Sequence, residues 1–287
     1  MAGQGAQPQI FFVVGYLKSG TTWLQLLLDS HPQVSCRGEG HLWSIFGEGL
    51  AKLIEGYNKE QAWLAETTFK GLQPFPQADP QDAVAIMRLF ALRMLTKGLD
   101  PKLYKAFGEK TPNHVKYLDA INLSFPRAKF VHIVRDGRDA ALSGWHHYRR
   151  LKPEELEKKW GGDFHRWAVS AAHQWVRETG MARAAAGSYE GRLSELRYED
   201  LLASPEAPVA GLFEFLGVEA SPEAVRAALA ASDFESLSEG RKRGEEDSGS
   251  FFRKGVAGEW REFFPEKTLA AFNEIAGERL RDYGYEV

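Results

Sequence analysis

A short apolar run that ends in a glycine-rich loop constrains the fold of this 287-residue chain more than any other feature. Residues 10–14 (IFFVV) have no polar–apolar alternation, which is typical of a strand buried on both faces of a parallel sheet. Residues 15–22 (GYLKSGTT) follow directly, and residues 23–28 then have the pattern of a helix. Strand, loop and helix in this order indicate an α/β fold, with binding sites at the carboxyl ends of the strands.

The same strand–helix pattern returns later in the chain. Residues 130–134 (FVHIV) predict a second buried strand followed by a helix from about 138 to 147, and residues 193–198 predict a weaker third strand. Residues 236–250 are polar, charged and glycine-containing, so we expect a flexible loop there. We therefore predict a single domain over residues 1–287, with a central parallel sheet flanked by helices. Further helices are expected at 80–97, 164–186, 207–216 and 265–281.

Composition limits the class of protein. The formal net charge of −3 argues against nucleic-acid binding through overall basicity, although a few residues can still form a local pocket for a small polyanion. Cys36, the single cysteine, leaves no intrachain disulfide or cysteine-rich metal site, and we expect it to be a small buried apolar residue. No segment approaches the roughly 18 consecutive apolar residues of a membrane span, and residues 1–9 lack a signal-peptide pattern. The expectation is a cytoplasmic globular protein.

The loop at residues 15–22 has the groups needed to hold an anion. Its glycines let the backbone approach closely, its amides form a concave nest at a helix N-terminus, and Lys18 adds a full positive charge. The spacing of its two glycines mimics the Walker A loop, but Thr21 stands where that motif requires lysine. A magnesium-dependent kinase or hydrolase is therefore the weaker interpretation, and no metal site is expected. A plain strand–helix turn is the structural alternative.

These residues resemble a known family. Residues 16–23 (YLKSGTTW) are similar to the 5′-phosphosulfate loop of sulfotransferases that use 3′-phosphoadenosine-5′-phosphosulfate (PAPS), which typically reads YPKSGTTW in the cytosolic members. Leu17 replaces the usual proline, a change that loosens the turn without removing a ligand. The resemblance implies the P-loop-like fold of this family. It also implies PAPS contacts from Lys18, Ser19, Gly20, Thr21, Thr22 and Trp23.

A second pair of residues matches the site that holds the 3′-phosphate of PAPS in this family. Arg135 closes the second predicted strand, and Ser143 follows eight residues later, two turns into the next helix, so both can converge on one phosphate. An arginine fork suits a dianionic phosphate better than a point charge does. Arg138 and Asp139, which lie between them, are expected to be surface or structural charges.

Two further segments resemble the family. Residues 253–260 (RKGVAGEW) are similar to the RKGxxGxW element, whose basic residues and glycine also contact the 3′-phosphate. Residues 196–201 (LRYEDL) are similar to a YEDL segment in which a tyrosine meets the adenine, so Tyr198 is the candidate, with core packing as the alternative. The contacts that carry over from the first segment are Arg253, Lys254 and Gly255.

The resemblance also implies the chemistry, an in-line displacement at sulfur in which an acceptor hydroxyl attacks and 3′,5′-phosphoadenosine (PAP) leaves. Lys18 is the expected donor to the charge that develops on the departing oxygens. The sulfuryl group carries less charge than a phosphoryl group, so no divalent metal is required. Lys110, in residues 108–114 (GEKTPNH), resembles the lysine that contacts the transferring group, but the histidine that follows two residues later in the cytosolic enzymes is missing.

Glu39 is the expected general base. Residues 29–43 (DSHPQVSCRGEGHLW) resemble a segment of the tyrosylprotein and heparan sulfotransferases, and Glu39 aligns without a gap with their catalytic glutamate. It would follow the strand after the first helix, where nearby lysines keep it ionised. His41 and His114 stay open as alternative bases, and an ordinary ion pair of Glu39 with Arg37 or a lysine is the structural alternative.

The acceptor is expected to be a hydroxyl-bearing small molecule, first an alcohol or phenol, with sugars and tyrosyl peptides left open. A non-catalytic adenine-nucleotide-binding module is the remaining alternative. The oligomeric state is left open, because the dimerisation motif of the family, KxxxTVxxxE, is not legible around residues 261–273. Four segments should form the acceptor pocket: 41–46, 63–75, 145–160 and 236–252. Their aromatic residues favour an apolar pocket: Trp43, Phe46, Trp63, Phe69, Phe75, Trp145 and Tyr148.

Overall fold

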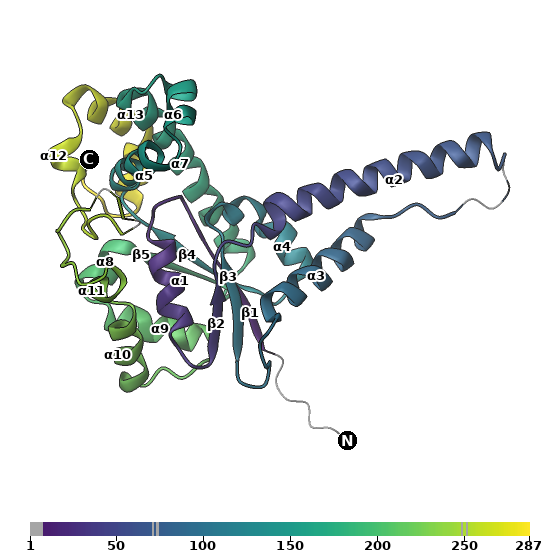
Figure 1. Ribbon diagram of the computed structural model, residues 1–287, viewed down its shortest axis with the longest axis horizontal. Coiled ribbons are helices and arrows are strands. Elements are labelled where there is room, and N and C mark those ends of the chain that lie inside the picture. The colour runs from purple at the N-terminus through teal and green to yellow at the C-terminus, as the bar shows by residue number, and fades with distance from the viewer. Residues whose placement is uncertain (1–7, 71, 73–74, 248, 251) are drawn as a thin grey trace.

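A parallel β-sheet forms the centre of the computed structural model (Figure 1). The structure describes residues 8–70, 72, 75–247, 249–250 and 252–287, and in this part of the chain the sheet has five strands in the order β2-β3-β1-β4-β5. All neighbouring strands run parallel, which confirms the predicted α/β class. The strands are β1 (Gln9–Gly15), β2 (Val34–Arg37), β3 (Ala106–Lys110), β4 (Lys129–Val134) and β5 (Leu193–Arg197).

Helices cover both faces of this sheet. The α-helices are α1 (Thr21–Asp29), α2 (Glu48–Thr67), α3 (Pro80–Thr96), α4 (Leu118–Ser124), α5 (Gly137–Leu151), α6 (Pro153–Trp160), α7 (Phe164–Ser188), α8 (Tyr198–Ala203), α9 (Glu206–Leu216), α10 (Pro222–Ala231), α11 (Phe234–Leu237), α12 (Trp260–Phe263) and α13 (Glu266–Asp282). A π-helix, η1 (Leu42–Gly47), and a 3₁₀-helix, η2 (Pro112–Tyr117), complete the regular elements. No helix in the described ranges is long and apolar enough to cross a membrane.

The burial of β1 on both faces explains why residues 10–14 show no polar–apolar alternation. Successive side chains of a strand point to opposite faces. Phe11 and Val13 pack in one cluster with residues of α1, α9 and α10, whereas Phe12 and Val14 pack in a second cluster with residues of α3 and α4. All four side chains are buried, so every position of the run has to be apolar.

The predicted strands and helices agree with the structure to within a few residues, but several further elements were not predicted, among them β3 and α2. The strand β3 reads AFGEK, and its charged residues Glu109 and Lys110 hide a strand that is buried along its whole length. The helix α2 was not predicted either, because its long, mainly polar sequence buries only Leu50. Cys36 is buried, as expected.

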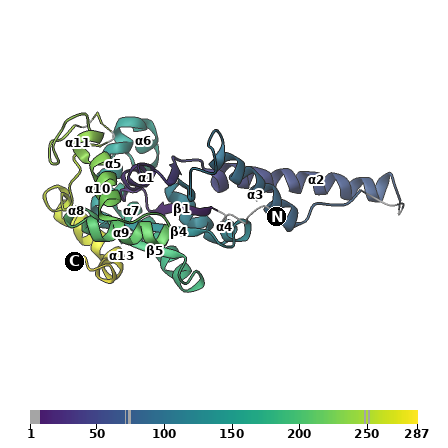
Figure 2. The same ribbon diagram turned by 90° about the horizontal axis from the view of Figure 1, so that it is seen from below.

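The helices α2 and α3 project away from the sheet as an arm in both views (Figures 1 and 2). The two sides of the arm are tied by Asn58, whose side chain donates to the carbonyl oxygen of Ala78 and accepts from its N–H, both at 2.8 Å. Nearer the sheet, the rings of Phe46 and Phe90 stack with their centroids 3.7 Å apart. The arm is therefore a packed hairpin, and several apolar side chains on it are exposed: Leu53, Trp63, Phe69, Leu72, Phe75, Ile86 and Leu89.

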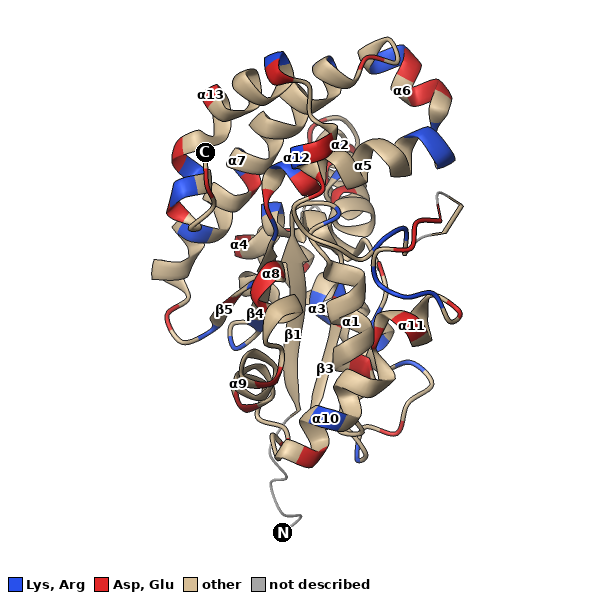
Figure 3. Cartoon of the chain, turned by 90° about the vertical axis from the view of Figure 1, so that its left-hand side faces the viewer, with Lys and Arg blue, Asp and Glu red and all other residues tan. Residues whose placement is uncertain are grey.

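A long connection between α11 and α12 folds back along the body of the protein. Basic side chains follow α11 on this connection (Figure 3). Buried Asp139 accepts from the N–H groups of Gly258 at 2.5 Å and Trp260 at 3.0 Å, which fixes the end of the connection against α5. Arg138 is also buried, so both charges are structural and neither is at the surface. The flexible loop expected at 236–250 includes position 248, which lies outside the described residues, and its mobility stays a prediction.

Candidate functional site

The carboxyl ends of β1, β3 and β4 border a cavity of about 610 Å³, lined largely by loops and helix ends. This is the location expected for a parallel sheet. Ser19 is buried beside the cavity, and Lys110 reaches its wall from the end of β3. The predicted site residues that line the cavity are Lys18, Gly20, Thr21, Thr22, Trp23, Glu39, His41, Arg135, Ser143, Tyr198, Arg253, Lys254 and Gly255.

The glycine-rich loop has a backbone that few residues could adopt. Gly20 has a φ of 94°, and a Cβ placed on it would lie 2.5 Å from the ring of Tyr198. Lys18 also has a positive φ, of 63°, which directs the chain around the turn. Burial, followed by the positive charges of Arg135 and other nearby cations, lowers the pKa of Lys18 to about 8. The loop therefore presents a crowded, electropositive surface to the cavity.

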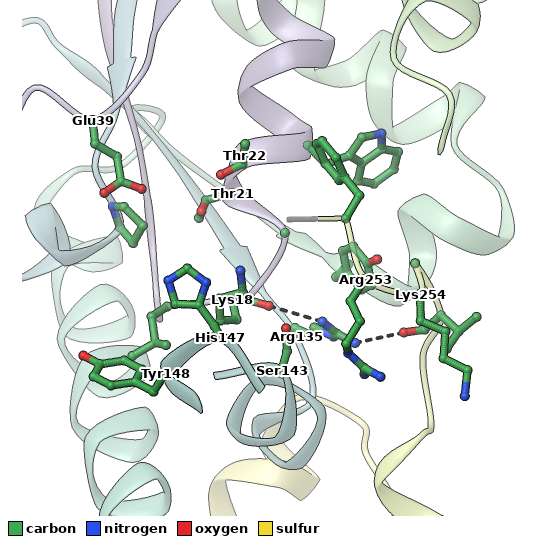
Figure 4. Close-up of a pocket in the computed structure, with 18 of the residues that line it drawn as sticks. Lys18, Thr21, Thr22, Glu39, Arg135, Ser143, His147, Tyr148, Arg253 and Lys254 are labelled. Atoms are coloured by element: carbon green, nitrogen blue, oxygen red, sulfur yellow. Dashed lines mark hydrogen bonds between the residues drawn. The ribbon is translucent and has the colours of Figure 1, made fainter. Parts of the chain in front are cut away.

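Arg135 connects three separate parts of the site. Its guanidinium group donates to the carbonyl oxygen of Lys18 at 3.3 Å and to that of Val256 at 2.9 Å, and it lies 4.7 Å from the centre of the Tyr198 ring. Its Nε atom is buried and has no hydrogen-bond partner among the described residues. Ser143 lines the same cavity from α5 (Figure 4). Arg135 and Ser143 therefore line the same cavity, and their shared contact with one phosphate stays a prediction.

The basic pair Arg253–Lys254 is already engaged with carboxylates. Arg253 contacts Glu246 at 2.8 Å and forms a bidentate pair with Glu259, and Nζ of Lys254 lies 3.4 Å from Glu259. Burial raises the pKa of Glu259, but hydrogen bonds and the charge of Arg253 outweigh it, so the pKa of this carboxyl is lowered overall. An anion that binds here has to replace or share these contacts. Glu259 was not predicted as a site residue, although it lies within the RKGVAGEW element.

Aromatic side chains form the wall next to this basic pair. The rings of Trp23 and Tyr198 meet edge to face with centroids 5.9 Å apart. The guanidinium of Arg243 lies 5.7 Å from the Trp23 ring and 5.5 Å from that of Phe234. Gly255 is required beside them, because it has a φ of 67° and a Cβ on it would lie 2.5 Å from Phe234. Phe234 was not predicted, since no motif includes it, whereas Arg243 lies in the predicted acceptor segment 236–252.

Glu39 lies at the other end of the cavity, just beyond β2 (Figure 4). Its carboxylate oxygens are 2.7 Å from Nζ of Lys110 and 3.3 Å from Nε2 of His41, and its side chain is 41% exposed. Nζ of Lys110 also donates to Oγ1 of Thr22 at 3.1 Å. The ion pair with a lysine that we considered as a structural alternative is thus present, but its lysine also contacts the glycine-rich loop. Arg37 donates instead to backbone carbonyls at the end of α3.

A buried network supports the loop that carries Glu39. Oε2 of Glu109 accepts from the N–H of Gly40 at 2.8 Å and from Oγ1 of Thr111 at 2.9 Å. Nδ1 of His114 lies 2.6 Å from the other carboxylate oxygen of Glu109, and Nε2 of His114 accepts from the N–H of Trp43 at 3.4 Å. His114 is fully buried in this network, so the hypothesis that it is the base is wrong.

The predicted acceptor segments 41–46, 145–160 and 236–252 each contribute to the lining of the cavity, but most of the aromatic residues expected there do not. Trp43 and Trp145 are buried in apolar clusters, and Phe46 stacks on α3. Trp63, Phe69 and Phe75 lie on the exposed arm, and positions 71, 73 and 74 of that segment lie outside the described residues. Among the named aromatic residues that the structure describes, Tyr148 alone lines the cavity.

The side chains that η2, α5 and α7 contribute to the lining of the cavity are mainly polar. Burial and then the charges of Lys18 and Arg150 lower the pKa of His147 to about 4, so its imidazole is neutral at neutral pH. His147 and Lys152 lie in the predicted acceptor segment 145–160, whereas the lining residues on η2 and α7 were not predicted as site residues. Two of the latter, Gln174 and Glu178, are spaced by four on one helix, which is the signal that could have revealed a shared polar face. The lining residues on η2 and α7 that were not predicted are Pro112, Asn113, Lys116, Gln174 and Glu178.

Sequence comparisons identify the kind of protein that this chain resembles. The model of the sulfotransferase family matches residues 8–222. Protein-tyrosine sulfotransferase 2 of Gallus gallus is 26% identical over 217 residues, which are 73% of this chain and 51% of that protein. Human sulfotransferase 2A1 is 23% identical over 181 residues, which are 56% of this chain and 59% of that protein. The chain thus spans about half the length of these relatives.

Solved structures share the fold. Mouse sulfotransferase SULT7A1 complexed with PAP has a TM-score of 0.59 at 16% identity, with 98% of this chain and 86% of that chain covered. The sulfotransferase domain of the Synechococcus PCC 7002 olefin synthase has the same TM-score at 17% identity, with 100% and 98% covered. Retinol dehydratase in complex with androsterone and PAP has a TM-score of 0.52 at 22% identity, with 99% and 84% covered.

Proposed function

Because the chain belongs to the sulfotransferase family, we propose that it transfers a sulfuryl group from PAPS to a hydroxyl of an acceptor. The observation that carries this proposal is that one cavity joins the glycine-rich loop, Arg135 and the pair formed by Glu39 and Lys110. A nucleotide-binding module needs only the first two of these. The pair adds a carboxylate at the end away from the basic residues Arg253 and Lys254 (Figure 4).

The chain has suitable contacts for each part of the donor. The buried Nε of Arg135, which lacks a partner in the described part of the chain, supports a phosphate site beside Ser143. Lys254 and Arg253 would share that phosphate after exchanging contacts with Glu259. The wall formed by Trp23, Tyr198 and Phe234 suits the adenine, since aromatic side chains stack on bases. The 5′ end would then lie on the glycine-rich loop, with Lys18 closest to the leaving oxygen.

PAPS supplies the sulfuryl group: the acceptor oxygen forms a new bond to sulfur, and the bond between sulfur and the 5′-phosphate oxygen breaks with its electron pair on that oxygen. Glu39 accepts the hydroxyl proton in this scheme. Lys18 stabilises the negative charge on the leaving oxygen, and Lys110 holds both the Glu39 carboxylate and the Thr22 hydroxyl in place. His41, 3.3 Å from Glu39, orients the carboxylate.

Transfer of label from ³⁵S-PAPS to an acceptor library, with and without EDTA, tests the proposal. We expect labelled product at the same rate with and without EDTA, because Lys18 and Lys110 supply the positive charge that a metal ion would otherwise provide. Magnesium-dependent ATP hydrolysis without labelled product would instead indicate a kinase or hydrolase. PAP binding without turnover, unaffected by alanine at Glu39 or Lys110, would indicate a non-catalytic module.

We further propose a hydroxyl-bearing small molecule as acceptor and a cytoplasmic location, the latter to be tested by cell fractionation.

A further inference from the structure

The elements η2 and α7 contribute hydrogen-bonding side chains to the cavity that the proposed transfer does not use. Gln174 and Glu178 project from α7 one turn apart, and Nε2 of Gln174 donates to Oε1 of Glu178 at 2.8 Å. Nζ of Lys116, on η2, lies 2.8 Å from the same oxygen. All three residues line the cavity, so the acceptor meets an amide, a carboxylate and an ammonium group.

Glu178 and one atom of Asn113 are buried at a cost that a polar ligand can recover, whereas Gln174 is half-buried and Lys116 is exposed. The Glu178 side chain is only 2% exposed, and Oδ1 of Asn113, which lines the same end, is buried without a hydrogen-bond partner among the described residues. A buried polar atom without a partner destabilises the folded protein. An apolar acceptor would leave Asn113 unpaired and would remove water from its neighbours, whereas a ligand hydroxyl can donate to it.

The charges at this end are paired within the chain. Glu178 pairs with Lys116, and Glu39 pairs with Lys110. A charged acceptor would have to compete with these pairs. A neutral compound with several hydroxyls can accept from Lys116 and donate to Glu178 without breaking either pair, because each hydroxyl both donates and accepts. The wall therefore favours a neutral polyol over a charged peptide.

We propose that Asn113, Lys116, Gln174 and Glu178 form a subsite for a neutral polyhydroxylated acceptor of the sugar or cyclitol class. The subsite holds some ring hydroxyls while a neighbouring hydroxyl faces Glu39. This inference rests on the proposed sulfuryl transfer and names its substrate class. It accounts for the amides and ion pairs that η2 and α7 contribute to the lining, whereas the aromatic wall of Trp23, Tyr198 and Phe234 lies beside the basic pair Arg253–Lys254.

Matched acceptors test the subsite in the full chain with ³⁵S-PAPS. Methyl β-D-glucopyranoside and cyclohexylmethanol both carry a primary hydroxyl on a six-membered ring, but only the glucoside has further hydroxyls. Methyl β-D-glucopyranoside or myo-inositol should exceed cyclohexylmethanol in kcat/KM by about 100-fold, because a site built to bond hydroxyls rejects analogues that lack them. A tyrosyl peptide serves as the charged comparison.

Two variants on α7 test whether the preference for the polyol over cyclohexylmethanol depends on the proposed subsite. Gln174→Met removes the amide at nearly constant length and should reduce the preference for the polyol about tenfold, mainly through KM. Arg177→Met, at an exposed position of the same helix, should leave the preference within about twofold. PAP affinity, measured by calorimetry, should be the same in both variants, which checks that they are folded.

Several results would overturn the subsite. One is a kcat/KM for cyclohexylmethanol or the tyrosyl peptide that equals or exceeds that for the polyols. Another is that a chain that binds PAP labels neither polyol. The third is that Gln174→Met leaves the preference for the polyol over cyclohexylmethanol unchanged. Such results leave the sulfuryl transfer standing wherever another acceptor is labelled. Loss of both PAP binding and all labelling would refute the proposed function itself, so the two failures are distinguishable.

Discussion

The ammonium group of Lys110 lies 2.7 Å from the carboxylate of Glu39 and, through the same nitrogen, 3.1 Å from the hydroxyl of Thr22. One buried cation at the end of β3 therefore joins the loop after β2 to the start of α1. The proposed base and the proposed donor loop cannot shift independently while this contact is kept. Reaction geometry at such a site depends on small displacements, so the contact is the natural place to begin testing the chemistry.

Glu39→Gln should reduce kcat by about 10²–10⁴-fold, since an amide cannot accept the proton of the attacking hydroxyl. PAP affinity should change by less than about twofold, because the amide oxygen can still accept from Lys110. Steady-state kinetics and calorimetry measure the two effects. His41→Phe is the control and should cost less than about fivefold. A Glu39→Gln protein that keeps more than a tenth of wild-type kcat would rule out this base.

Arg135→Ala should weaken PAP binding by about 30–100-fold, because hydrogen bonds to a charged group contribute about 1.5–3 kcal/mol. At saturating PAPS, kcat should stay within about fivefold, since Arg135 is assigned to the phosphate remote from the reacting bond. Arg226→Ala, at an exposed position on α10, is the matched control and should bind PAP as the wild type does. Equal losses in kcat and affinity would contradict the separate roles of Arg135 and Glu39.

The affinity for PAP should fall as the pH rises above about 8. Burial and neighbouring cations lower the pKa of Lys18 to about 8 in the free protein, so the charged form that attracts the 5′-phosphate is present below this pH and is lost above it. Calorimetry from pH 7.5 to 9.5 should show log K falling with a slope approaching one. Lys18→Arg should flatten this dependence, because arginine keeps its proton. A slope that is unchanged in Lys18→Arg would assign the titration to another group.

Gly20→Ala should lower the melting temperature by about 3–8 °C, whereas Gly38→Ala should change it by less than about 1 °C. A Cβ on Gly20 meets the Tyr198 ring at 2.5 Å and stands at a φ of 94°, while a Cβ on Gly38 meets no atom within 4 Å. A strained residue of this kind costs about 1–3 kcal/mol. Scanning calorimetry compares the two proteins, and similar shifts for both would mean that the loop relaxes around the methyl group.

Glu109→Gln should lower kcat about tenfold and leave PAP affinity nearly unchanged. Glu109 is buried and holds the backbone of Gly40, next to the proposed base, so it acts as a positioning residue. Thr111→Ser keeps the hydroxyl that donates to Glu109 and should retain at least about half of the activity. A parallel loss of kcat and PAP affinity in Glu109→Gln would indicate a general loss of structure instead.

Much of the fold could be predicted because its signals are local. The run at 10–14 has apolar residues at every position since both faces of β1 are covered, and the helix after it begins at the glycine-rich loop. By contrast, β3 escaped prediction because Glu109 and Lys110, two charges that normally mark a surface, are buried by partners from distant segments. A charged strand is recognisable only when those partners are known.

The sequence by itself determined the class of the fold, the anion-binding loop and the family, because each depends on residues that are neighbours along the chain. Only the tertiary structure decided which groups share the cavity. It removed His114 from the candidates for the base, since that ring is buried against Glu109, and it placed Lys110 between Glu39 and Thr22. The polar acceptor end likewise depends on η2 and α7 packing together, a contact between segments about 60 residues apart that no local pattern specifies.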